Sequence, residues 1–183
     1  MPTVPVNLLR TFRVLAASLM AAPVVIGIAL SFMVYSHPHV DRSGHLVHPH
    51  TPGVWMYGTI VALGVIVAGL AQTFGYRIPA LQPGLDSAEA RASGLRLYQT
   101  SAIRRFALSE LVVIVAIVLL FVGRSNTILP YVVAAAITEL LMAYHVWPSE
   151  RLIDRVQQRL DRDGGRSDLA NALNGTAALN GTG

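Results

Sequence analysis

The chain lacks cysteine and lysine, and it carries little charge. Without cysteine it forms no disulfide, no cysteine-ligated zinc or iron–sulfur site, no thiol nucleophile and no lipid anchor on a cysteine. Charged residues make up 13% of its 183 residues, against about 25% in soluble domains. Hydrophobic residues make up 53%, and the mean hydropathy is +0.51. These values argue against an ordinary soluble domain and favour a small membrane protein.

The sequence also lacks the common catalytic motifs. It contains no P-loop, no dinucleotide-binding glycine pattern, no HExxH motif and no Gly-x-Ser-x-Gly elbow. We therefore expect the protein not to be an enzyme and to need no cofactor, unless its histidine-rich segment binds zinc or copper.

Four apolar runs reach the roughly 17 to 25 residues that a helix needs to span a bilayer. They cover residues 14–35, 54–76, 106–123 and 128–147. The first two runs contain no charge, the third contains Glu110, and the fourth contains Glu139 and His145. The predicted fold class is therefore all-α: a polytopic membrane protein built as a four-transmembrane-helix bundle with cytoplasmic helical extensions.

The arginines predict how these spans are oriented. Twelve of the 14 basic residues lie before the first span, between the second and third, or after the fourth. Because positively charged loops stay in the cytoplasm, we expect a bacterial inner-membrane protein with both termini in the cytoplasm. The pI is near 10.0, but arginines placed beside apolar runs indicate lipid contact and not nucleic acid. The expected partners are the lipid bilayer and other membrane subunits or further copies of the chain.

Helices are also predicted outside the spans. In the cytoplasmic loop 77–105, Asp86 is a candidate N-cap and Glu89 suits the first turn of a helix that continues into the third span. Residues 148–163 form a predicted amphipathic helix, and residues 164–183, rich in Gly, Asn and Ala, a predicted disordered tail. The apolar stripe of the amphipathic helix fits anionic headgroups, a partner protein or a merely solvated extension; it consists of Leu152, Ile153, Val156 and Leu160.

Four polar residues fall at comparable depth near one end of three predicted spans. They are Gln72, Glu110, Glu139 and His145, and a closed bundle could gather them into one intramembrane polar layer. A charge at that depth costs several kcal/mol unless it is paired, neutralised or wetted. The carboxyls are therefore candidates for proton binding. The alternative is a structural hydrogen bond, or contact between Glu110 and Arg104 or Arg105.

The predicted outward loop is rich in histidine. Its five imidazoles belong to His37, His39, His45, His48 and His50. Neutral imidazole binds zinc or copper well, and histidine also titrates in mild acid. A proline-rich hairpin with solvated histidines is the alternative.

Part of the sequence resembles a group of uncharacterised small bacterial four-span membrane proteins. The resemblance rests on Ile103 to Glu110, Leu129-Pro130 and Trp147-Pro148-Ser149, and it implies the fold without a function. Our first expectation is a non-catalytic accessory or assembly subunit of a larger inner-membrane complex, such as a lipid-import or respiratory assembly. The second is a small proton-coupled transporter using Glu139, and the third is a metal-binding or sensing protein using the histidine loop.

Overall fold

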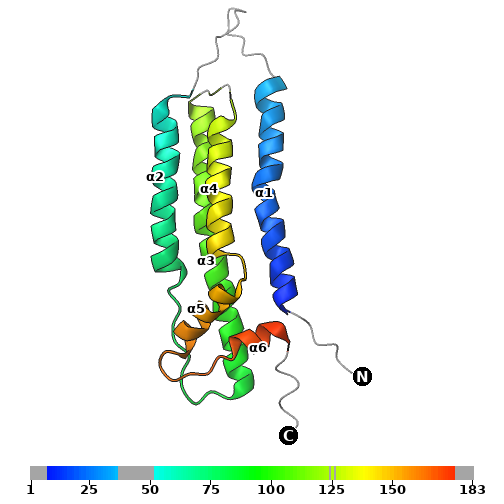
Figure 1. The fold of residues 1–183 in the computed structure, drawn as a ribbon, viewed down its shortest axis with the longest axis vertical. Helices are drawn as coiled ribbons and strands as arrows, with labels where there is room; N and C mark the ends of the chain where they lie inside the picture. The colour runs from blue at the N-terminus through cyan, green and yellow to red at the C-terminus, as the bar shows by residue number, and fades with distance from the viewer. Residues whose placement is uncertain (1–7, 37–51, 124, 126, 176–183) are drawn as a thin grey trace, which may run out of the picture.

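A computed structural model describes residues 8–36, 52–123, 125 and 127–175. Every regular element in this part of the chain is a helix (Figure 1). The elements are α1 (Leu8–Ser36), α2 (Val54–Leu70), the π-helical turn η1 (Ala71–Gly75), α3 (Ser87–Val122), α4 (Leu129–His145), α5 (Glu150–Asp161) and α6 (Leu169–Asn174).

Three of these helices are long and apolar enough to cross a membrane. They are α1 with 29 residues, α2 continued by η1 with 22, and α3 with 36. The 17 residues of α4 reach about 26 Å at 1.5 Å per residue. The helices α4 and α5 meet at a bend of 58°. The chain has a fourth candidate span only if this bent pair of helices is counted as one span. The chain is thus all-helical, with three to four candidate spans, consistent with a multi-pass membrane protein.

The helices α2, α3 and α4 form the packed part of the bundle, and α1 stands beside α4 (Figure 1). Small residues allow the close approach: a Cβ built on Gly64 of α2 would lie 2.7 Å from Ile137 Cγ2 of α4. One hydrogen bond joins α1 to α4, since Tyr131 Oη donates to the Pro23 carbonyl at 2.6 Å. Of the most apolar stretch of α1, 17% is buried within the protein, against 28% for α2 with η1 and 33% for α3, so α1 is the least buried of these three helices.

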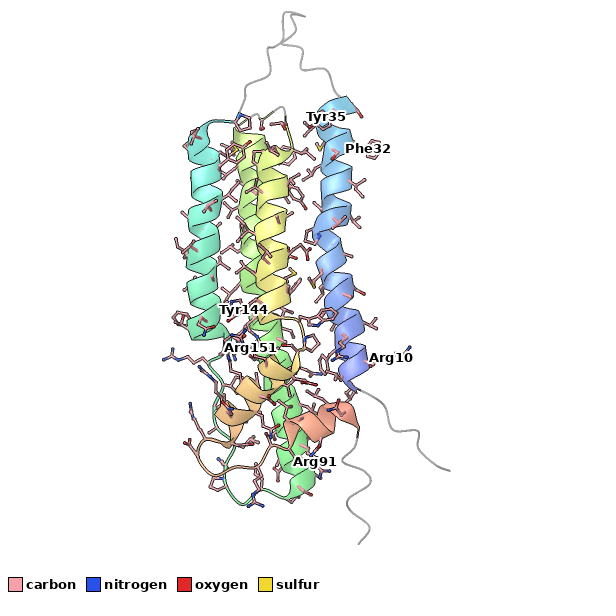
Figure 2. The ribbon with its side chains drawn as sticks, viewed as in Figure 1. Arg10, Phe32, Tyr35, Arg91, Tyr144 and Arg151 are labelled. Carbon is pink, nitrogen blue, oxygen red and sulfur yellow. The ribbon has the colours of Figure 1, made fainter. Side chains whose placement is uncertain are left out.

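The predicted N-cap of the long helix is confirmed. Asp86 Oδ1 accepts hydrogen bonds from the backbone amides of Ala88 and Glu89, both at 2.8 Å. From there α3 runs without a break to Val122, so its first turns extend beyond the bundle (Figure 1). We call the end of the molecule that holds these turns, the start of α1, α5 and α6 the arginine-rich end; Arg10, Arg91 and Arg151 lie there (Figure 2).

A second core at the arginine-rich end corrects the interpretation of the amphipathic stripe. Leu152, Ile153, Val156 and Leu160 are at most 4% exposed and pack within the protein, against Tyr98 of α3 and other apolar residues. The stripe therefore covers neither a membrane surface nor a partner. Amphipathic spacing predicts that a face is buried, but not what buries it.

The predicted disordered tail also needs correction. Residues 169–174 form α6, whose Leu169 and Leu173 are fully buried in this second core. Arg91 pairs with Asp168 at 3.4 Å just before the helix. Two leucines four residues apart share one helix face. Their burial accompanies a helix in a segment whose Gly, Asn and Ala content predicts disorder. Residues 176–183 lie outside the described part of the chain.

Candidate functional site

Two carboxyl groups lie near each other where α3 packs on α4. Glu110 lies on α3 and Glu139 on α4, and both are half-buried. The Oε1 atom of each is buried without a hydrogen-bond partner, and the two groups lie close enough to repel each other electrostatically. Neither forms an ion pair with another described residue. The bundle therefore holds two acidic groups without a cation beside them.

A hydrogen bond between α3 and α4 sets the position of this carboxyl pair. Thr138 Oγ1 donates to the Ser109 carbonyl at 3.2 Å, and both residues are fully buried. Because Ser109 directly precedes Glu110 and Thr138 directly precedes Glu139, the bond fixes the register of the two helices where the carboxyls lie. Tyr131 also lies near both carboxyls.

An open cavity of about 320 Å³ lies between α1, α3 and the end of α4, nearer the arginine-rich end than the carboxyl pair, and neither Glu110 nor Glu139 lines it. Its mostly apolar walls come from α1, α3 and the residues after α4. Phe106, in one wall, precedes Glu110 by one helical turn, and Val146, in another, follows Glu139 by about two turns. The carboxyls thus stand on helix faces that continue into the cavity walls.

The predicted layer of four polar groups does not form. Gln72 is exposed on η1, where Ala71 and Gly75 are the buried residues. His145 is buried, but six residues separate it from Glu139, which is about 120° around a helix of 3.6 residues per turn. Its Nδ1 lies 3.3 Å from the Tyr76 hydroxyl instead. The structure brings together Glu110 and Glu139 only.

A second polar cluster, which the sequence analysis missed, surrounds Tyr76 at the arginine-rich end. The guanidinium carbons of Arg105, Arg155 and Arg159 lie 4.6, 5.2 and 5.9 Å from the centre of the Tyr76 ring. These distances are typical of cation–π contacts. We call the following residues the arginine–tyrosine cluster: Tyr76, Arg105, Tyr144, His145, Arg151, Arg155 and Arg159.

The π-helical turn shapes one side of this cluster. Ser101 Oγ donates to the Gly75 carbonyl at 2.8 Å, and a Cβ on Gly75 would lie 2.5 Å from Arg105 Cγ. Only glycine leaves room for the stem of this fully buried arginine. Such π-turns occur frequently at functional sites.

Two arginines donate hydrogen bonds to backbone carbonyls at the end of the α2–η1 helix. Arg159 Nη1 donates to the Tyr76 carbonyl at 2.8 Å, and Arg104 Nη2 donates to the Arg77 carbonyl at 3.1 Å. The last carbonyls of a helix lack partners within it, and positive charge is favourable there. These two side chains therefore have a structural role.

A signal for the cluster was present in the sequence. Tyr98, Ser101, Arg105 and Ser109 recur at spacings of three or four residues, which places them on one face of α3. All four are buried. The sequence analysis counted Arg105 as a charge flanking a span and did not consider it as part of a polar stripe.

The histidine loop cannot be placed. Its five histidines fall within residues 37–51, outside the described residues, so metal binding there stays a prediction. Within the described ranges, no three His, Asp or Glu side chains are grouped so that they could hold a metal ion.

Comparison with known proteins adds no relative. No protein-family model matches the chain, and searches of curated proteins and of solved structures find no match.

Proposed function

We propose that the chain is a small proton-coupled transporter of a bacterial inner membrane, in which Glu139, paired with Glu110, binds the proton. In this proposal α4 is the fourth span, the arginine-rich end lies in the cytoplasm with both termini, and the histidine loop faces outward. The observation that supports it is the carboxyl pair, which has no cationic partner among the described residues and lies one to two helical turns from the walls of the apolar cavity.

The argument for a proton starts from the cost of charge in a membrane. An ionised carboxylate costs several kcal/mol inside a bilayer unless it is paired, and two adjacent carboxylates also repel each other. Neither Glu110 nor Glu139 has a cationic partner among the described residues. A proton is the counter-ion that such a pair accepts.

The cavity suggests the kind of substrate. Its walls are mainly apolar, with Tyr98 and Gln99 as polar exceptions. A pocket of this composition suits an apolar or amphipathic small molecule that makes one or two hydrogen bonds.

The test uses Glu139→Gln, which keeps the shape of the side chain but cannot release a proton. Proteoliposomes loaded with a pH-sensitive dye report proton movement when a panel of amphipathic compounds is added. The wild type is expected to move protons with at least one compound, and Glu139→Gln is expected to abolish that movement while remaining folded. Glu150→Gln, at an exposed position on α5, is the matched control; flux unchanged in Glu139→Gln would refute the proposal.

An accessory or assembly subunit of a larger membrane complex is the second candidate. The apolar stripe of α5 no longer supports it, but α1 does. Only 17% of the most apolar stretch of α1 is buried within the protein, and Val25 and Phe32 are 63% and 70% exposed. Purification in mild detergent distinguishes the candidates: a stoichiometric partner protein favours the accessory role, and a single monodisperse species counts against it.

A further inference from the structure

The positive charge of the arginine–tyrosine cluster has no acidic partner among the described residues. The ion pairs found there, Arg91 with Asp168 and Arg162 with Asp163, involve other arginines. Within the cluster, Arg105 and Arg155 lie against the Tyr76 ring and Arg151 against the Tyr144 ring, and both rings contact His145. Three like charges thus surround one buried ring without a counter-ion.

Of these three arginines, Arg105 has the strongest need for a counter-ion. Its side chain is 0% exposed. Nε donates to the Ser101 carbonyl of its own helix at 3.2 Å, and the guanidinium lies against the Tyr76 ring, but Nη1 and Nη2 are buried without a hydrogen-bond partner. Burying a charge and leaving its donors unsatisfied are both costly. An anion bound beside the cluster lowers the cost of this buried charge by electrostatic attraction.

The surface beside the cluster is shaped to admit part of such an anion. A notch of about 10 Å³ lies where α4 gives way to α5, lined by Tyr76, Tyr144, Ser149, Arg151, Leu152 and Arg155. That volume is close to one water-sized probe, which is room for a single oxygen atom. Arg151 Nη2 donates to Tyr144 Oη at 2.6 Å, and Figure 2 shows these two side chains together at the junction of the helices.

The chemistry of the donors identifies the anion. Guanidinium groups present planar pairs of N–H donors that match phosphate oxygens, and they stack on aromatic rings as Arg151 does on Tyr144, at 4.8 Å. A tetrahedral phosphoryl group can place one oxygen in the notch and leave the others for the arginines at its rim.

We propose that the arginine–tyrosine cluster binds a phosphoryl group. Arg151 and Arg155, which line the notch, hold its oxygens, and the charge of Arg105, 4.6 Å from the centre of the Tyr76 ring, stabilises it electrostatically. The phosphoryl group comes from the headgroup of an anionic phospholipid or from a free phosphate compound. This site does not depend on the proposed proton transport.

The experiment measures thermal unfolding of the full chain in zwitterionic detergent. Inorganic phosphate and phosphatidylglycerol are titrated in separate arms, against chloride at equal ionic strength and against diacylglycerol, which has the same acyl chains without the phosphoryl group. A ligand that binds the native state raises the Tm, so at least one phosphoryl probe is expected to raise it above its matched probe. Stabilisation by phosphatidylglycerol alone assigns the site to a lipid headgroup; stabilisation by inorganic phosphate assigns it to a free phosphate compound.

Two variants locate the binding. Arg155→Gln is expected to lower the affinity for the probe that raises the Tm about tenfold or more, because it removes a charge-assisted hydrogen bond. Arg96→Gln removes the same charge from an exposed position on α3 and is expected to keep the wild-type affinity. If Arg155→Gln does not fold, Arg151→Gln, at an exposed position, carries the same expectation.

Two outcomes would overturn the inference. One is that neither phosphoryl probe raises the Tm above its matched probe. The other is an equal loss of affinity in Arg96→Gln and in the cluster variants, since this would mean that charge attracts the anion without a site.

Discussion

Replacing Leu160 by alanine tests whether the apolar stripe of α5 packs inside the protein. Leu160 is 0% exposed, and a Cβ built on Gly94 of α3 would lie 3.7 Å from its Cδ1. Truncation removes three carbons, worth about 2.4 kcal/mol at roughly 0.8 kcal/mol per buried methylene. Gly94 has no side chain to fill the space, and an unfilled cavity adds to the cost. We therefore expect a loss of about 3–4 kcal/mol, within the range of about 2–5 kcal/mol known for such truncations.

Trypsin offers a direct assay, because α5 contains Arg151, Arg155 and Arg159 and must open before trypsin can cleave it. When opening and closing are fast relative to cleavage, the rate follows the open population. A loss of 3 kcal/mol raises that population about 100-fold or more. Gln158→Ala, at an exposed position on the same helix, is the control and is expected to leave the rate nearly unchanged. Equal rates for Leu160→Ala and the control would refute the internal packing of the stripe.

Two further substitutions test close contacts in the bundle. Gly75→Ala is expected to destabilise the protein by about 1–3 kcal/mol, because its Cβ would lie 2.5 Å from Arg105 Cγ; thermal unfolding in detergent should show no loss for Gly69→Ala, where a Cβ meets nothing within 4 Å. Tyr131→Phe removes the 2.6 Å hydrogen bond to the Pro23 carbonyl, worth about 0.5–1.5 kcal/mol, and is expected to speed amide hydrogen exchange in α1 but not in α2. Unchanged exchange in α1 would mean that apolar packing alone holds this helix.

The elements that the sequence predicted well are those whose signal is local. A long apolar run and a capping aspartate such as Asp86 act within their own segment, so α1, α2 and α3 form where the sequence predicts helices, although α1 begins at Leu8, six residues before the predicted span. The stripe on α5 also has helical spacing, but the residues that bury it belong to other segments, among them Tyr98 of α3. The leucines of α6 supply part of that covering, and composition alone had assigned them to a disordered tail.

The candidate sites were harder to predict because they depend on the angle at which a side chain leaves its helix. Depth along the spans grouped Glu139 with His145, whereas the helical angle between them directs His145 to Tyr76. Gln72 sits in a π-turn, a feature that apolar periodicity does not reveal. Of the four residues grouped by depth, Glu110 and Glu139 lie on the two helices that the Thr138–Ser109 hydrogen bond joins.

The two candidate sites need opposite counter-ions and do not supply them to each other. Arg105 and Glu110 are five residues apart on α3, about 140° around the helix, so the nearest buried cation faces Tyr76 and not the carboxyl pair. Arg104, the other arginine considered as a partner for Glu110, donates to the Arg77 carbonyl. In the two proposals, the carboxyl pair takes up a proton and the arginine–tyrosine cluster binds an anion, and neither site provides the other's counter-ion. It follows that proton movement should survive Arg155→Gln and that phosphoryl binding should survive Glu139→Gln, so the failure of one proposal leaves the other standing.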